Sequence, residues 1–237
     1  MSTQQYSHIK RIVGDYLVSY GVIQSVYDSC DVIDFFKIGE FQYGLYLADV
    51  AGTGDSSVAV MNKLQSLINK HCFACLESKE ELNLDPAIIV KNINTEMYSA
   101  KLGKYITLIY GILDLKTNTL NYTIGGYYPN PILVDSKFHA KYLFGKGYPL
   151  GIVPQATFEN FTVPIDPNNS LIFFSDGIMR YFMPGEDSES KDNGLLNLVC
   201  SSKVEIDSIL QKLDLTYSTP IIDDIVIFTI QRKDKIK

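Results

Sequence analysis

The stretch Phe41-Gln-Tyr-Gly-Leu-Tyr-Leu-Ala-Asp-Val50 runs directly into Ala51-Gly-Thr-Gly54, and this junction decides the predicted fold. Residues 15–27 and 32–38 precede it and share its alternation of apolar and polar side chains and its content of Val, Ile and Tyr. Alternation with a period of two is typical of β-strands. The pattern predicts a series of antiparallel strands, the last of which ends at an acid followed by glycines.

After the glycines the apolar period changes. From Ser56 apolar residues recur at three- and four-residue spacing, at Met61, Leu64, Leu67, Ile68, Cys72 and Cys75. This spacing predicts an amphipathic helix of about five turns. Asp85-Pro86 then has the form of an acidic N-cap followed by proline in the first turn, and predicts a second helix with Ile89, Ile93 and Met97 on one face.

Strand character returns after the two helices, and the order of elements indicates the fold class. Strands are predicted at residues 105–113, 119–124, 131–134, 158–163, 170–174 and 225–230, with a late helix near 204–213 and a mobile polar surface loop at 183–193. Strands bunched on either side of a helix pair favour an α+β fold with largely antiparallel sheets over a doubly wound nucleotide-binding fold. We expect one domain over residues 13–232, an N-terminal extension over 1–12 and a tail over 233–237.

Composition narrows the class of protein. The chain has 237 residues and a net charge of −6, which disfavours nucleic-acid binding, and no apolar run reaches the roughly 18 residues that a membrane-spanning helix needs. Four cysteines without the density of a disulfide scaffold favour a cytoplasmic protein. Cys72-Phe-Ala-Cys75 has redox or zinc spacing, but it continues the apolar stripe, so we interpret it as core.

Four acids stand where a strand begins or ends, and they are the candidate functional residues. Asp49 and Asp176 each end an apolar strand and are followed by glycine, and Asp223-Asp224 opens the last strand. A carboxylate in an apolar setting needs a partner, and Mg²⁺ and Mn²⁺ prefer carboxylate, carbonyl and water oxygens. The alternative for any one site is an Asp-Gly turn or, for Asp49, a helix cap.

The acids lie within five segments that resemble one family. The segments occur in the family's order, and they are Leu47-Ala-Asp-Val-Ala-Gly-Thr-Gly54, the stretch Tyr110–Tyr122 followed by Gly125–Pro131, Gly147-Tyr-Pro-Leu-Gly-Ile152, Phe174-Ser-Asp-Gly177, and Asp223-Asp-Ile-Val226. In this pattern the chain resembles the SpoIIE/RsbU-type protein serine phosphatases, a bacterial branch of the metal-dependent PPM phosphatases, over about residues 13–232.

The resemblance implies a fold, an activity and a set of ligands. The fold is a PPM-like α/β/β/α sandwich of two mainly antiparallel sheets flanked by helices, and the activity is hydrolysis of phosphoserine or phosphothreonine on a protein with two Mn²⁺ or Mg²⁺ ions. Asp49 and Asp176 are the implied catalytic residues. The implied metal ligands are Asp31, Asp49, Val50 through its carbonyl, Asp176, Asp223 and Asp224, with Asp223 favoured over Asp224. Nearby supporting or substrate-loop positions are Asp34, Gly52, Thr53, Gly54 and Gly177.

The family's usual substrate is a phosphorylated regulatory protein, an anti-sigma-factor antagonist in a partner-switching pathway, and a homodimer is left open. The chain departs from the family pattern at positions beside the acids: Ser29 and Cys30 replace two glycines, Thr53 a histidine, Val226 a threonine, and Met179-Arg180 a Thr-Glu pair. These departures favour a second hypothesis, a catalytically weak PPM-like module that binds a regulatory partner.

Overall fold

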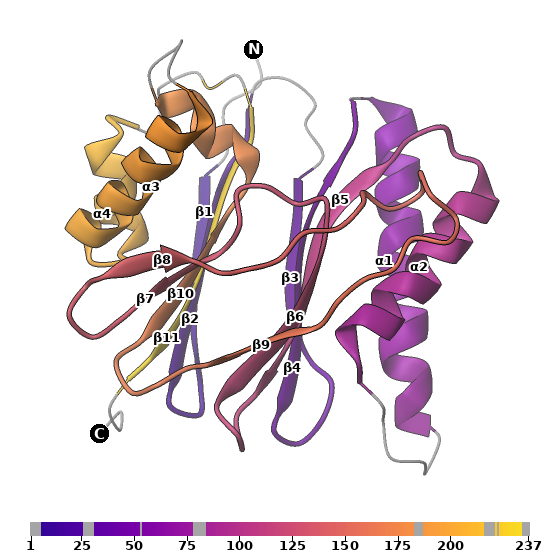
Figure 1. Ribbon diagram of the computed structural model, residues 1–237, viewed down its shortest axis with the longest axis horizontal. Coiled ribbons are helices and arrows are strands. Elements are labelled where there is room, and N and C mark those ends of the chain that lie inside the picture. The colour runs from indigo at the N-terminus through magenta and orange to yellow at the C-terminus, as the bar shows by residue number, and fades with distance from the viewer. Residues whose placement is uncertain are drawn as a thin grey trace. The chain divides into compact units, whose positions relative to one another are not determined.

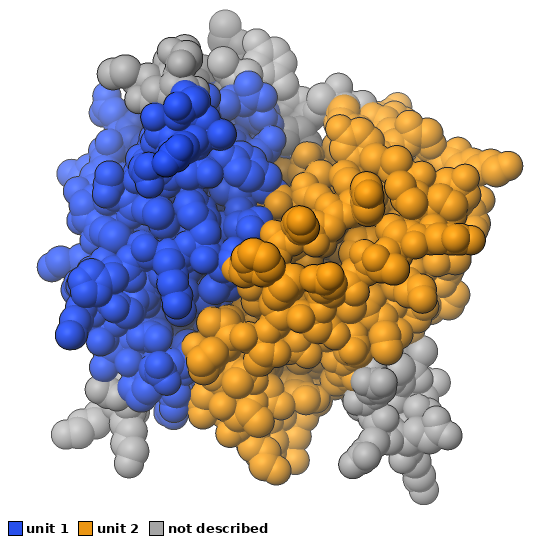
Figure 2. Space-filling view, viewed as in Figure 1, with its two compact units in different colours: residues 1–29, 128–143, 165–237 blue, residues 30–127, 144–164 orange. Residues whose placement is uncertain are grey.

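The computed structural model describes residues 6–25, 31–52, 54–77, 84–182, 187–215, 221 and 223–233. The chain divides into two compact units, coloured separately in Figure 2. Unit 1 comprises residues 1–29, 128–143 and 165–237, and unit 2 comprises residues 30–127 and 144–164. Each unit contains one sheet with its own helices (Figure 1).

Unit 2 contains a five-stranded antiparallel sheet and the two described helices of the first half of the chain. The sheet order is β3 (Asp31–Lys37), β4 (Gln42–Val50), β5 (Ile106–Asp114), β6 (Thr119–Gly125) and β9 (Phe161–Pro164). Helices α1 (Asp55–Glu77) and α2 (Pro86–Ala100) pack on one face through an apolar core that includes Leu64, Ile68, Ile93, Tyr46 and Leu108.

Unit 1 contains a six-stranded antiparallel sheet and the later helices. The sheet order is β1 (Tyr6–Val13), β2 (Tyr16–Ile23), β11 (Ile225–Arg232), β10 (Ser170–Phe174), β7 (Ile132–Val134) and β8 (Ala140–Tyr142). A 3₁₀ helix η1 (Asp176–Tyr181) follows β10 directly, and α3 (Ser188–Ser202) and α4 (Ile206–Lys212) share a core with the sheet that includes Phe174, Leu195, Ile209 and Ile227.

The α+β class with two mainly antiparallel sheets is confirmed, and so are both early helices. Val60, Leu64, Leu67, Ile68 and Cys72 form the buried stripe of α1. The Cys72 Sγ lies 3.0 Å from the Tyr110 hydroxyl, which confirms its place in the core, whereas the side chain of Cys75 lies outside the described part. No described helix is both long and apolar enough to span a membrane.

Three elements differ from the sequence-based expectation. Residues 6–12, expected to lie in an extension, form β1 together with Val13 and pair with β2, and β8 is a short strand that the pattern does not reveal. The predicted polar loop at 183–193 is wrong from Ser188 onward, because α3 begins there, while 183–186 lie outside the described residues. The Asp187 carboxylate caps α3 by accepting a hydrogen bond of 2.8 Å from the Ser190 N–H.

The N-cap of α2 gives a stability prediction. The Asp85 side chain accepts a hydrogen bond of 3.0 Å from the Ile88 N–H, as the sequence predicts. We expect Asp85→Ala to lower the free energy of unfolding by about 1 kcal/mol, because an N–H of the first turn loses its acceptor. Urea unfolding followed by circular dichroism measures this. Asp166→Ala, at an exposed turn, is the control, and an equal loss there would contradict the capping role.

Candidate metal centre

Two of the predicted acids lie directly opposite each other in unit 2. Asp31 opens β3 and Asp49 stands near the end of β4, and the register of the two strands makes them Cα partners. Directly opposite residues of an antiparallel pair project from the same face at about 4.5–5.5 Å between Cβ atoms. Both residues are half-buried, and the Asp31 Oδ2 is shielded from solvent. The arrangement sets two like charges side by side.

Asp34 lies on the other face of the same sheet. Side chains alternate along a strand, so Asp34 cannot share a face with Asp31. Its Cα partner is Tyr46, whose side chain belongs to the core beneath α1 and α2. The negative charge of Asp34 also adds to burial in raising the pKa of Tyr46. The structure therefore brings together Asp31 and Asp49 but separates Asp34 from them.

The loop after Asp49 is fixed by its backbone. The Ala51 N–H donates to the Tyr105 carbonyl at 3.0 Å, which extends the β4–β5 pairing by one step. Gly52 and Gly54 have φ angles of +81° and +82°, in the left-handed region that glycine adopts most readily. The Gly54 carbonyl accepts the Ser57 N–H at 2.8 Å and so begins α1. Thr53 lies outside the described residues.

Lys104 is a residue beside this loop that the sequence analysis did not single out. Its ammonium donates a hydrogen bond of 2.6 Å to the Ser57 Oγ, in the first turn of α1. A Cβ atom built on Gly52 would stand 2.8 Å from the same Nζ, so the cation lies directly against the loop that follows Asp49. No motif marks Lys104, because its proximity arises from the pairing of β5 with β4.

The other three acids, Asp176, Asp223 and Asp224, lie in unit 1, where β10 ends and β11 begins. Ser175 ties these ends together, because its hydroxyl donates to the Asp224 carbonyl at 3.1 Å and accepts from the Val226 N–H at 2.9 Å. A side chain on Gly177 would overlap the Asp224 carbonyl oxygen, which explains why glycine follows Asp176. The turn from β10 into η1 thus packs directly against the start of β11.

The electrostatics show that Asp176 and Asp223 are neighbours. Partial desolvation, and then the negative charge of Asp223, raise the pKa of the Asp176 carboxyl above its usual value, although the residue as a whole is exposed. The positive charge of Arg180 acts in the opposite direction. Arg180 itself donates to the Asp223 Oδ2 from Nε at 3.0 Å and from Nη2 at 2.8 Å. This pairing is a second feature that sequence reasoning missed.

Asp224 has a different setting from Asp223. It is buried, with 6% of its surface exposed, and its Oδ1 accepts a hydrogen bond of 2.6 Å from the Ser25 N–H. The side chain therefore joins the end of β2 to the start of β11. The backbone N–H of residue 25 thus binds the Asp224 carboxylate, which is not directed to solvent.

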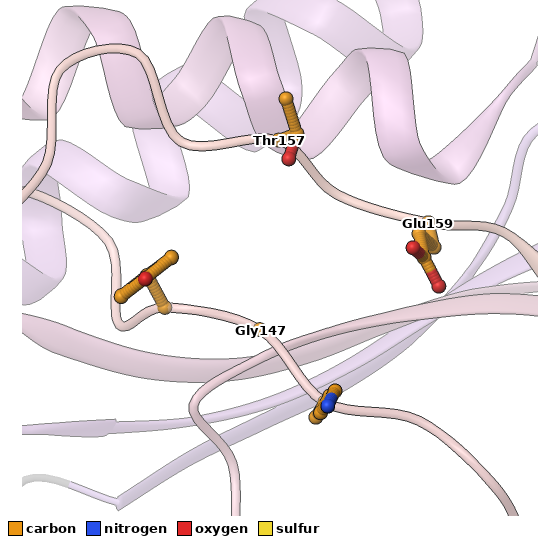
Figure 3. A pocket seen from close by; sticks show the side chains of 5 residues that line it. Gly147, Thr157 and Glu159 are labelled. Atoms are coloured by element: carbon orange, nitrogen blue, oxygen red, sulfur yellow. The ribbon is translucent and has the colours of Figure 1, made fainter.

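The segment Gly147–Ile152 supports the start of β5 and borders a pocket of unit 2. Leu150 and Ile106 exchange two backbone hydrogen bonds of 2.8 and 3.1 Å. The pocket has a volume of about 380 Å³ and is lined by Lys146, Gly147, Tyr148, Thr157 and Glu159. Figure 3 shows Thr157 and Glu159 on one segment, across from the segment that carries Gly147. None of the predicted metal ligands lines this pocket.

The donor chemistry of both acid pairs suits a hard divalent cation. Each pair consists of carboxylates, and each holds negative charges close enough for a cation to relieve their repulsion. Within either unit, the described residues contain no group of three or more His, Cys, Asp or Glu side chains arranged to hold an ion. Mn²⁺ or Mg²⁺ fits the residue types, with Arg180 as a competing cation in unit 1.

Comparison with known proteins decides the family. Residues 39–233 match the profile of the family described as Stage II sporulation protein E (SpoIIE). The chain belongs to the SpoIIE family. The match runs from before the strand that carries Asp49 to the end of the strand that Asp223 and Asp224 precede, so it includes the loop at Gly52 and Gly54 as well as four of the acids.

Solved structures share the fold. The PP2C phosphatase domain of SpoIIE from Bacillus subtilis, solved with a fragment of its regulatory domain, matches with a TM-score of 0.72 and 18% identity, over 99% of this chain and 71% of that one. RsbX in complex with magnesium matches with a TM-score of 0.64 and 15% identity, over 95% and 99% of the two chains. At these identities the likeness shows the PPM-type fold of this SpoIIE-family chain.

The curated relatives RsbU and RsbP are longer than the segments over which they match this chain. RsbU, a phosphoserine phosphatase of Bacillus subtilis (strain 168), is 24% identical over 214 residues, which cover 86% of this chain and 60% of RsbU. RsbP, a phosphoserine phosphatase of the same strain, is 22% identical over 156 residues, covering 64% of this chain and 36% of RsbP. The chain thus spans about a third to three fifths of the length of these relatives.

The Asp31–Asp49 pair gives a prediction for the metal-free chain. We expect Asp49→Asn to raise the melting temperature in EDTA by about 1–3 °C, because like charges directly opposite each other in a sheet are destabilising. The same variant should lose most of the rise in melting temperature that Mn²⁺ produces. Asp34→Asn, on the other face of β3, is the matched control. If Asp34→Asn alone lost the Mn²⁺-induced rise in melting temperature, the assignment of Asp49 as a metal ligand would be contradicted.

A second prediction separates Asp223 from Asp224. Asp224→Ala should lower the free energy of unfolding by about 1–3 kcal/mol, because it removes the acceptor of the part-buried Ser25 N–H. Asp223→Ala should change stability less but should reduce the Mn²⁺-induced rise in melting temperature. Thermal unfolding with and without Mn²⁺ measures both effects. A larger loss of the Mn²⁺ effect in Asp224→Ala would reverse the assignment.

Proposed function

We propose that this SpoIIE-family chain is a metal-dependent protein phosphatase that hydrolyses phosphoserine or phosphothreonine on a protein. The observation that carries the proposal is the pairing of strand-end acids, Asp31 with Asp49 and Asp176 with Asp223, of which all but Asp31 lie within the family match. Each pair is proposed to contribute ligands to a divalent ion, and the family resemblance leads us to expect two ions.

The chain's own residues have distinct roles in this proposal. Asp31 and Asp49 hold negative charge on one face of the unit 2 sheet, and the carbonyl of Val50 adds a neutral oxygen at the end of β4. Asp176 and Asp223 hold negative charge at the start of η1 and of β11. Mn²⁺ or Mg²⁺ held by these oxygens would supply an activated water as nucleophile and would neutralise phosphate charge. Lys104 keeps the loop after Asp49 against the first turn of α1.

The substrate proposed is a phosphorylated regulatory protein. RsbU and RsbP are both described as phosphoserine phosphatases, which supports a phosphoserine substrate here. An anti-sigma-factor antagonist in a partner-switching pathway is the form of substrate that the family resemblance implies. Magnesium bound to RsbX supports Mg²⁺ as one candidate ion beside Mn²⁺. A homodimer and a cytoplasmic location stay predictions from the sequence.

One observation favours the second candidate function, a catalytically weak module that binds a regulatory partner. Arg180 occupies an oxygen of Asp223, one of the acids that the proposed mechanism needs. A chain whose second ion binds weakly could keep the fold and the binding surface of the family while hydrolysing slowly. Binding of a phosphoprotein without metal-dependent hydrolysis would support this candidate over the enzyme.

The two acid pairs predict how activity is lost. Asp49→Asn and Asp176→Asn should each lower the rate of phosphoserine-peptide hydrolysis in Mn²⁺ by more than about 100-fold, because each removes an anionic ligand without changing side-chain size. Loss of a residue that only contacts a ligand typically costs about 10–100-fold. Phosphate release measures this, and circular dichroism checks folding. Asp166→Asn is the exposed control. Full activity in either site variant would place the chemistry elsewhere.

A further inference from the structure

Arg180 forms hydrogen bonds with Asp223, one carboxylate of the Asp176–Asp223 pair in unit 1. It belongs to η1, four residues after Asp176, and its Nε and Nη2 donate to the Asp223 Oδ2 at 3.0 and 2.8 Å. The Arg180 side chain is 56% exposed and that of Asp223 is 24% exposed. The pair therefore lies at the surface of unit 1, where an incoming ion meets the arginine.

The hydrogen bonds to Asp223 account for most of its acceptor capacity. Each carboxylate oxygen offers two lone pairs, and both N–H groups of Arg180 are directed at Oδ2. The other oxygen, Oδ1, accepts the Asp224 N–H at 3.1 Å and keeps one lone pair. A cation that ligates Oδ2 must therefore displace the guanidinium, and a cation at Oδ1 would meet a positive charge close by.

The sequence adds an independent observation. Arg180 occupies the position at which the motif of the resembled family has a glutamate. This chain therefore carries a positive charge where the motif carries a negative one. A departure of this kind, together with two directed hydrogen bonds to a predicted ligand, is more specific than either observation alone.

We infer that the Arg180 guanidinium acts as a built-in cation at Asp223, and that a divalent ion enters this half of the metal centre only by displacing it. The inference rests on the metal centre of the proposed function and concerns how that centre is loaded. Because the guanidinium competes with an added ion for Asp223, the binding step that fills this site is expected to be the weaker of the two.

The experiment measures Mn²⁺ binding to the full chain in the absence of any substrate. Isothermal titration of Mn²⁺ into the wild type should show two steps, and Arg180→Gln should strengthen the weaker step by about tenfold, because a repelling charge near the ligand is lost. Arg180→Glu, which restores the family's residue, should strengthen it further. Arg180→Lys keeps the charge but not the two-pronged geometry, and should fall between the wild type and Arg180→Gln.

Two controls make the result specific. Lys212→Gln removes one positive charge from the exposed end of α4 in the same unit, and should leave both binding steps unchanged. Asp223→Asn should abolish the gain that Arg180→Gln produces when the two substitutions are combined, because the gain acts through that carboxylate. A gain that persists in the double variant, or an equal gain in Lys212→Gln, would overturn the inference.

A second measurement follows the arginine directly. In the ¹H–¹⁵N spectrum, the Nε–H signal of Arg180, assigned by its loss in Arg180→Gln, should shift when diamagnetic Mg²⁺ fills the weaker step. An unmoved signal at full occupancy, or equal affinities in the wild type and Arg180→Gln, would overturn the inference. Because neither readout involves hydrolysis, an inactive chain with the predicted affinities would refute the proposed function while leaving the role of Arg180 intact.

Discussion

The register of β3 and β4 is the constraint on which the acid pair of unit 2 depends. The two carboxylates face each other because the β3–β4 register pairs them, and that register is fixed by the apolar residues on the opposite face. A slip of one residue would turn Asp49 into the core beneath α1 and would take Val50 out of that core. Burial of the helix-facing side chains thus offsets the cost of holding two like charges together.

The segments that define the family are far apart in sequence, and the structure shows how neighbouring ones support each other. Leu150 pairs with Ile106 at the start of β5, and the preceding residue, Tyr105, accepts the hydrogen bond that extends β4 past Asp49. In unit 1, Ser175 bridges the carbonyl of Asp224 and the N–H of Val226. Each motif therefore contributes backbone support as well as the acids, which is why replacing residues beside the acids can leave the fold in place.

The sequence predicts features that depend on the local spacing of apolar residues. It does not predict contacts between residues that are far apart in the chain. The stripe of α1 and the N-cap of α2 follow from spacing and from Asp85, and strand-end acids follow from where apolar runs stop. β1 escapes prediction because it is an edge strand whose apolar residues Ile9 and Ile12 are 42% and 63% exposed, so it shows no buried face. α3 begins with polar residues that look like a loop. No local pattern could reveal that Arg180 pairs with an acid 43 positions away.

The two acid pairs illustrate how one family pattern can be kept while its charge balance changes. In unit 2 the carboxylates of Asp31 and Asp49 face each other across neighbouring strands, so a cation placed there would relieve their mutual repulsion. In unit 1 such repulsion is partly relieved from within, because the Arg180 guanidinium already neutralises Asp223 and lowers the penalty on ionising Asp176. An internal cation stabilises the metal-free state of a site that a metal would otherwise stabilise. It therefore reduces the free energy that an added ion can contribute at Asp176 and Asp223.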